Sequence, residues 1–317
     1  MNIVIMESLG ISQEELNERK APFERMGCTF KCFEKTTDIP TLIDRAKDAD
    51  AIILANMPLP EKVINSCPQL KFIDIAFTGV DHVAMGAVRK KNIVVSNAAG
   101  YSNDSVAELG VGLVLGLLRN IPQVEQRCRN GLTKDGLVGH ELKGKTIGII
   151  GLGKIGKRSA ELYHAFGCKV LANSRSIKDD CPNYISQVSR DELLSESDIV
   201  LLHCPLNEST RGMINSAALS KMKTTAILVN LARGPVVVAK DLADALNNDV
   251  IAGAAIDVFD KEPPLDADEP LLHAKNTIVT PHIAFATKES MSLRAKIVFD
   301  NLKAWMDGKP QNVVNQI

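Results

Sequence analysis

The chain has 317 residues, of which 45% are apolar and 24% are charged, so it is long enough for two domains with cores of their own. A formal net charge of −1, with Lys and Arg scattered along the chain, argues against nucleic acid and anionic membrane surfaces as partners. No apolar run approaches the ~18 residues of a membrane span, and the cysteines form no zinc-binding pattern, so we expect a cytoplasmic protein without a metal site.

Short apolar runs alternate with segments of helical spacing over the first hundred residues. The opening "MNIVIMESLG" has no basic region before its apolar run and predicts a strand rather than a signal peptide. Strands are expected at 2–6, 28–33, 51–55, 70–76 and 93–97, with helices between them at 12–26, 39–48 and 60–66. This βαβ alternation predicts a parallel sheet covered by helices on both faces.

A long apolar helix is expected next over 102–122, capped by Ser102 or Asn103 and ended by Pro122. We interpret it as a connector that leaves the first domain. A second βα series begins at 145–151, and its further strands are expected at 169–173, 198–202, 226–230, 251–256 and 277–280, before a final helix over 287–307. The predicted fold class is therefore α/β, with two doubly wound parallel-sheet domains and a ligand cleft between them.

A glycine-rich turn connects the first strand and helix of the second series. Gly151-x-Gly153-x-x-Gly156 follows an apolar strand and opens a helical pattern. In such a turn the first glycine allows the tight bend, the second lets a pyrophosphate approach the backbone, and the third lets helix and strand pack closely. The segment 139–146 also matches GxxxxGK[ST], but it leads into a strand instead of a helix, so we treat that match as chance. The context predicts a dinucleotide-binding domain of the Rossmann type.

The segment "NSRS" stands where such a domain usually carries an acidic residue. Ser174 lies 18 residues after Gly156, and Arg175 and Ser176 follow it. A carboxylate there binds the ribose hydroxyls of NAD, whereas an arginine accommodates the 2′-phosphate of NADP. We therefore favour NADP(H) as cofactor. The alternative is that Arg175 is a solvated loop residue and that NAD(H) binds without the carboxylate.

Three polar residues lie just beyond the carboxyl ends of three successive expected strands, where open α/β sheets bind their ligands. Arg233 can hold a carboxylate or a keto oxygen through its fork of donors. His282 can exchange a proton with a substrate oxygen, and Glu262 can hydrogen-bond the imidazole and favour its protonated form. The three together predict a hydride-transfer site in which Arg233, Glu262 and His282 are catalytic.

Seven segments resemble the D-isomer-specific 2-hydroxyacid dehydrogenases, and the resemblance extends over essentially the whole chain. They are "FTGVDHV" (77–83), "NAAGYSNDSVAE" (97–108), "LKGKTIGIIGLGKIG" (142–156), "LLHCPLNEST" (201–210), "VNLARGPVVV" (229–238), "GAAIDVFDKEPP" (253–264) and "VTPHIAFAT" (279–287). The resemblance implies two Rossmann-like or flavodoxin-like domains: a discontinuous substrate domain, 1–98 plus 287–317, and a dinucleotide-binding domain, 99–286. It also implies a homodimer built through the dinucleotide-binding domain.

The resemblance assigns roles to further residues. Arg233, Glu262 and His282 match the catalytic set of the family, and the backbone amides of Thr78 and Gly79 match its substrate-carboxylate site. The residues implied in cofactor binding, besides those of the glycine motif and of the "NSRS" segment, are Lys154, Ile155, Cys204, Pro205, Thr210, Leu231, Ala232 and Asp257. Lys154 and Ile155 would meet the pyrophosphate, and Asp257 would bind the nicotinamide amide.

The expected activity is the reduction of small 2-oxoacids to D-2-hydroxyacids. Hydroxypyruvate and glyoxylate come first, because "NSRS" resembles the branch of the family that reduces them. Phe285, where many members have a serine, would instead favour an apolar substrate tail, unless it packs in the hinge. A lactate-type or an aryl- or branched-chain 2-oxoacid dehydrogenase that uses NADH therefore stays open. An alternative of another class is a dinucleotide-binding interaction protein of the corepressor kind.

Overall fold

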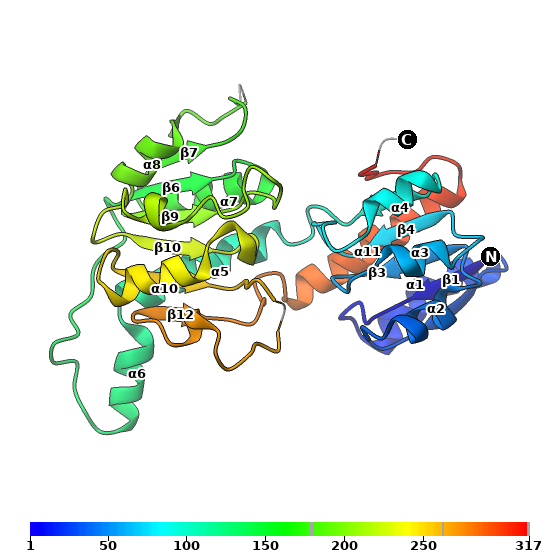
Figure 1. The fold of residues 1–317 in the computed structure, drawn as a ribbon, viewed down its shortest axis with the longest axis horizontal. Helices are drawn as coiled ribbons and strands as arrows, with labels where there is room; N and C mark the ends of the chain where they lie inside the picture. The colour runs from blue at the N-terminus through cyan, green and yellow to red at the C-terminus, as the bar shows by residue number, and fades with distance from the viewer. Residues whose placement is uncertain (178–179, 262, 316–317) are drawn as a thin grey trace. The chain divides into compact units, whose positions relative to one another are not determined.

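The computed structural model describes residues 1–177, 180–261 and 263–315. It divides into two compact units, unit 1 with residues 1–102 and 286–317, and unit 2 with residues 103–285 (Figure 1). The boundaries expected from the sequence were 98/99 and 286/287. Each unit contains one sheet in which all the paired strands are parallel, so the predicted fold class is confirmed.

Unit 1 is built on a five-stranded sheet with the order β2-β1-β3-β4-β5. Its strands are β1 (Asn2–Ile5), β2 (Thr29–Cys32), β3 (Ala51–Leu54), β4 (Phe72–Ile75) and β5 (Val94–Asn97). Its helices are α1 (Gln13–Arg25), α2 (Ile39–Ala46), α3 (Glu61–Asn65), α4 (Met85–Lys90) and α11 (Lys288–Met306). Every residue of β3 and β4 is buried, because central strands of a parallel sheet are covered on both faces.

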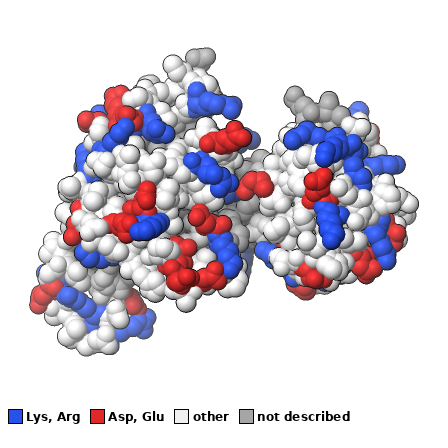
Figure 2. Space-filling model, viewed as in Figure 1, with Lys and Arg blue, Asp and Glu red and all other residues white. Residues whose placement is uncertain are grey.

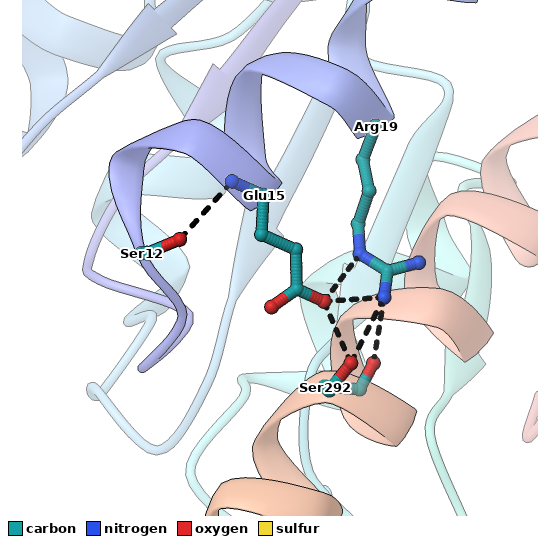
Figure 3. Close-up of polar contacts among 4 residues, drawn as sticks. All are labelled: Ser12, Glu15, Arg19 and Ser292. Atoms are coloured by element: carbon teal, nitrogen blue, oxygen red, sulfur yellow. Dashed lines mark hydrogen bonds and ion pairs between the residues drawn. The ribbon is translucent and has the colours of Figure 1, made fainter.

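The last helix of the chain belongs to unit 1, where it lies beside elements from the beginning of the sequence (Figure 1). Trp305 stacks on Phe72 of β4, with ring centroids 4.8 Å apart. Ser292 of α11 donates a hydrogen bond of 2.7 Å to Glu15 of α1, and Arg19 binds both residues (Figure 3). Apolar stacking and this polar cluster together anchor α11 to a sheet and a helix that come more than two hundred residues earlier.

Unit 2 is built on a seven-stranded sheet with the order β12-β11-β10-β9-β6-β7-β8. Its strands are β6 (Thr146–Ile150), β7 (Lys169–Asn173), β8 (Ile185–Gln187), β9 (Ile199–Leu202), β10 (Ile227–Asn230), β11 (Gly253–Ile256) and β12 (Thr277–Val279). Its helices are α5 (Asn103–Leu118), α6 (Ile121–Arg129), α7 (Lys154–Ala165), α8 (Arg190–Glu196), α9 (Ser216–Leu219) and α10 (Ala239–Asn247), with short 3₁₀ turns at Gly234–Val236 and Pro270–Leu272. The chain runs from β6 toward β8 and then returns to β9 on the other side of β6, so the strand order reverses there, where doubly wound folds bind their ligands.

The core of unit 2 has two apolar clusters, one for each face of the sheet. On β9, Val200 and Leu202 belong to one cluster, whereas Ile199 and Leu201 belong to the other. Neighbouring residues of a strand point to opposite faces, so this alternation shows that both faces of the sheet are covered.

The helix expected over 102–122 is in fact two helices. α5 ends at Leu118, Asn120 adopts a left-handed backbone with φ of 51°, and Pro122 lies in the first turn of α6. The prediction that Pro122 ends the helix was wrong, because proline is well tolerated in a first turn, where its missing N–H would have no partner. No helix in the described ranges is long and apolar enough to span a membrane alone; only α5 and α6 together reach that length and composition, and they are bent by 62°.

The surface carries charges of both signs. On the face drawn in Figure 2, Lys and Arg side chains are interspersed with Asp and Glu side chains over both units. Most of the ion pairs join exposed side chains, as Lys240 and Asp244 do. Such pairs contribute little to stability, since water screens them.

Candidate active site

The glycine-rich turn lies at the carboxyl end of β6, beside the point where the strand order reverses. Gly151 has a φ of 104°, and a Cβ on it would lie 2.6 Å from the backbone of His203 and Cys204. A Cβ on Gly156 would lie 2.1 Å from the Gly151 oxygen. Both positions therefore require glycine for local packing.

Gly153 differs from its two neighbours in the motif, since a Cβ there would meet nothing within 4 Å. It is the N-cap residue of α7, and its lack of a side chain leaves the first N–H groups of the helix uncapped. Lys154 and Ile155 form the first residues of α7. Open space in front of uncapped amides fits a pyrophosphate group, so the turn can hold a dinucleotide.

The "NSRS" segment follows β7, the strand next to β6. Arg175 and Ser176 are exposed. The Ser174 hydroxyl donates to the Ser176 carbonyl at 2.6 Å, so its proton is used within the turn. Arg175 is thus the exposed cation of this segment, and Ser174 would have to rotate before donating to a ligand.

The loop after β9 lies next to the glycine motif, because β9 pairs with β6. Cys204 is buried, and Pro205 is exposed. The Thr210 hydroxyl donates to the Pro205 carbonyl at 2.7 Å and accepts from the Asn207 N–H at 2.9 Å. Thr210 therefore closes this loop on itself and fixes the position of Pro205.

Arg233 follows β10, and its backbone is held from two sides. The Asn230 side chain accepts from the Ala232 N–H at 3.1 Å and donates to the Arg233 carbonyl at 3.0 Å. Gly234 packs so closely on the segment after β11 that a Cβ would lie 1.9 Å from the carbonyl carbon of Phe259. Leu231 and Ala232 are buried, while Arg233 is half-buried.

Asp257 follows β11 and organises the turn that carries His282. One of its oxygens accepts from the Thr280 hydroxyl at 2.6 Å and from the Ile283 N–H at 2.8 Å, and the other accepts from the Ala284 N–H at 2.9 Å. The His282 N–H donates to the Asp257 carbonyl at 2.8 Å. Burial raises the pKa of the Asp257 carboxyl, against the effect of these hydrogen bonds. Asp257 is fully buried, so its carboxylate holds this turn from within the fold.

His282 has a left-handed backbone with φ of 56°, which is uncommon for a residue other than glycine. Phe285 lies edge-on against its imidazole, with ring centroids 5.2 Å apart. The third member of the predicted catalytic set, Glu262, lies outside the described residues. Arg233 follows β10 and His282 follows β12. Since these strands are parallel members of one sheet, both residues lie beyond the carboxyl ends of its strands, at the same edge, as the sequence suggested.

Thr78 and Gly79 belong to unit 1, where they follow β4. The Thr78 carbonyl accepts from the Asn97 side chain at 2.7 Å. They lie at the carboxyl end of their sheet, as the residues above do in unit 2. No cluster of three metal-binding side chains occurs among the residues that the structure describes.

His203, directly after β9, makes a side-chain contact that the sequence could not predict. Its Nε2 lies 2.9 Å from the Ser159 hydroxyl on α7, and its Nδ1 is buried. Burial lowers the pKa of His203 to about 4, so the ring is neutral at pH 7. The histidine thus links the helix of the glycine motif to the loop that begins with Cys204.

Known proteins resemble the chain along its full length. The family model described as "D-isomer specific 2-hydroxyacid dehydrogenase, NAD binding domain" matches residues 111–284. A hydroxypyruvate reductase of Blautia hydrogenotrophica is 35% identical over all of both chains, and a glyoxylate reductase of Korarchaeum cryptofilum is 36% identical over 87% of this chain and 85% of its own.

Solved structures of enzymes show the same similarity over nearly the whole chain. An acyclic imino acid reductase in complex with NADPH and D-Arg superposes with a TM-score of 0.91 at 28% identity, covering 99% of this chain and all of the other. A D-lactate dehydrogenase of Aquifex aeolicus, complexed with NAD and lactic acid, gives 0.86 at 28% identity over 98% and 96% of the two chains. The chain is therefore a member of the D-isomer-specific 2-hydroxyacid dehydrogenases, oxidoreductases that work with a nicotinamide dinucleotide.

Proposed function

We propose that this enzyme reduces hydroxypyruvate and glyoxylate to the corresponding 2-hydroxyacids, with a preference for NADPH. The observation that supports this reaction is that Arg233 and His282 both lie beyond the carboxyl ends of strands in the unit 2 sheet. Asn230 and Asp257 hold the backbones of these two segments by hydrogen bonds. The two relatives named hydroxypyruvate reductase and glyoxylate reductase support the choice of substrates.

In this proposal, the reduced nicotinamide supplies a hydride to the keto carbon of the substrate. His282 gives a proton to the keto oxygen, and Glu262 keeps the imidazole protonated for that step. Arg233 and the amides of Thr78 and Gly79 bind the substrate carboxylate and carbonyl. Unit 1 is then the substrate domain and unit 2 the dinucleotide-binding domain.

The cofactor is held by unit 2. The amides of Lys154 and Ile155 bind the pyrophosphate beside the three glycines of the motif, and Asp257 accepts from the nicotinamide amide. The other residues proposed to line the cofactor are Cys204, Pro205, Thr210, Leu231 and Ala232, with Ser174, Arg175 and Ser176 at the adenosine 2′-phosphate. An exposed arginine beside two hydroxyl groups, with no carboxylate among residues 172–177, supports NADPH over NADH.

Initial rates test the reaction and the cofactor together. NADPH and NADH are each combined with hydroxypyruvate, glyoxylate, pyruvate and phenylpyruvate. Fast NADPH oxidation with the first two acids is the expected result. A preference for NADH with pyruvate or phenylpyruvate would indicate a lactate-type or aryl-2-oxoacid dehydrogenase instead, an alternative that the contact between Phe285 and His282 favours. Cofactor binding without turnover of any acid would indicate a corepressor-like binding protein.

The role of Arg175 is tested by Arg175→Asp, with Arg119→Asp as the matched control. Both arginines are exposed in unit 2 and the charge change is the same. Arg119 follows α5, whose Leu117 lies beside Gly253 at the start of β11, at the edge of the sheet opposite the strand ends that precede the segment 174–176. We expect Arg175→Asp to raise the Kd of NADPH by about 10- to 100-fold, the value of one or two charge-assisted hydrogen bonds, and to spare NADH. Equal effects of the two variants would refute the assignment of Arg175 to the 2′-phosphate.

The proposal includes a cytoplasmic homodimer formed by unit 2. α6 buries none of its residues, and Ile121 on it is exposed together with Leu132 and Val138 in the segment that follows. Apolar side chains on a projecting helix and loop support a contact with a second copy. Light scattering of the purified protein tests this, since a monomer mass would contradict it.

A further inference from the structure

A buried polar network in unit 1 surrounds Asn97, the last residue of β5. The Asn97 side chain donates to the Thr78 carbonyl, and its own backbone carbonyl accepts from the side chain of Asn301 on α11 at 3.1 Å. The same Asn301 amide donates to Asp74 on β4 at 3.1 Å, and its oxygen accepts from Asn312 at 2.8 Å. Asp74, Asn97 and Asn301 are all buried. The second oxygen of Asp74 is buried without a hydrogen-bond partner among the described residues, but the bonds that are made favour one arrangement of the segments that they join.

The backbone strengthens the same connection. The Ala98 N–H donates to the Ile75 carbonyl at 2.9 Å and to the Phe77 carbonyl at 3.1 Å. Together with the Asn97 side chain, these bonds attach the turn after β4 to the end of β5. Thr78 itself is exposed, so the turn is anchored on its inner side and open on its outer side.

Peptide geometry then decides where the next amide points. Among the described residues the only cis peptide bond is Pro263–Pro264, so Thr78 and Gly79 are joined by a trans peptide. In a planar trans peptide the carbonyl and the following N–H point in opposite directions. Because Asn97 draws the Thr78 carbonyl toward the buried network, the Gly79 N–H points away from it.

We propose that Asn97 is a positioning residue for the substrate carboxylate: it orients the Thr78–Gly79 peptide so that the Gly79 N–H is presented to that carboxylate. This inference rests on the proposed function, which assigns the carboxylate to these amides. Burial also raises the pKa of Asp74, which accepts from the Asn301 amide of the same network, well above its usual range.

Three variants test the proposal. Asn97→Ala removes the donor, whereas Asn97→Asp keeps the volume but places a carboxylate oxygen opposite the Thr78 carbonyl. Asn312→Ala is the matched control, since it removes an amide from the same network that does not contact Thr78. For each, we would measure the Kd of oxamate, an unreactive analogue in which an amide replaces the reducible carbonyl, in the presence of the cofactor. The Kd of the cofactor alone, kcat and KM for glyoxylate, and Tm complete the set.

We expect the oxamate Kd and the glyoxylate KM to rise about tenfold in Asn97→Ala, which is the effect of one lost hydrogen bond, and further in Asn97→Asp. The cofactor Kd should stay within about twofold, since unit 2 is untouched, and Asn312→Ala should bind oxamate as the wild type does. If Asn97→Ala does not fold, Asn97→Asp provides the comparison.

Unchanged oxamate affinity in a folded Asn97 variant would overturn the proposal. So would a lower Tm accompanied by equal losses of oxamate and cofactor binding, which would indicate a structural role only. A wild-type enzyme that binds oxamate but reduces no 2-oxoacid would refute the proposed function and leave the role of Asn97 to be judged from binding. A wild type that does not bind oxamate would refute both.

Discussion

Replacing Gly234 with alanine should push apart two backbone segments that are in contact next to Arg233: the one after β10, which contains Gly234, and the one after β11, which contains Phe259. A Cβ at this position would lie 1.9 Å from the carbonyl carbon of Phe259, 2.0 Å from its oxygen and 2.5 Å from the Asp260 nitrogen. All three are backbone atoms, so no side-chain rotation can relieve the overlap.

The geometry sets the size of the effect. Real Cβ atoms essentially never approach within 3.0 Å of such atoms, so the two backbones must separate by about 1.1 Å near Arg233. A displacement of about 1 Å in a positioning element costs about 100-fold in rate. The strain should also destabilise the protein by about 1–3 kcal/mol, which lowers Tm by about 2–4 °C for each kcal/mol in a domain of this size.

The assay compares kcat/KM for glyoxylate with the Tm of the same preparations. Gly112→Ala is the matched control, because Gly112 lies in α5 of the same unit and a Cβ there would meet nothing within 4 Å. Alanine is better than glycine in a helix by about 1 kcal/mol, so this control should keep its activity and its Tm should stay or rise. Wild-type kcat/KM in Gly234→Ala would refute the idea that this backbone contact holds Arg233 in place.

Asp257→Asn turns one acceptor oxygen into a donor, so a buried N–H such as that of Ala284 loses its partner at a cost of about 1–3 kcal/mol. We expect a lower Tm, and a fall in kcat that is larger than the rise in cofactor Kd. An unchanged kcat would contradict the role of Asp257 in holding the turn that carries His282. His203 has a lowered pKa of about 4 against 6.5 when unfolded, so the unfolded state takes up a proton first and stability is lost as pH falls from about 6.5 to about 4. Urea midpoints at pH 7, 6 and 5 should therefore fall less steeply in His203→Gln, and parallel curves would show that the ring is not neutral in the fold. Thr210→Val removes the hydroxyl that donates to the Pro205 carbonyl. We expect a several-fold higher cofactor Kd, measured by calorimetry, and an unchanged kcat at saturating cofactor, measured by initial rates. An unchanged cofactor Kd would show that this loop does not matter for binding.

Local signals in the sequence were sufficient for the glycine turn, most of the strands and the positions of Arg233 and His282 just beyond strand ends. Gly151 has a positive φ, which fits the tight bend that its motif predicts. Arg233 and His282 could be placed at one edge because the strands before them are parallel, which the βαβ alternation already implied. The predicted strands missed β8, whose three residues at the edge of the sheet are too short for a periodic pattern, and the break at Asn120 was hidden by continuous apolar spacing through α5.

Which distant residues meet was decided only by the tertiary structure. His203 and Ser159 are 44 residues apart, and Asn97 and Thr78 are 19 apart, so no local pattern pairs them. The same holds for Gly234, whose requirement for glycine comes from the backbone of the segment after β11 rather than from its own dihedral angles. Periodicity reports which face of an element is buried, because that depends on the element alone. The contact that each buried atom makes depends on how the elements pack, and only the folded chain brings those atoms together.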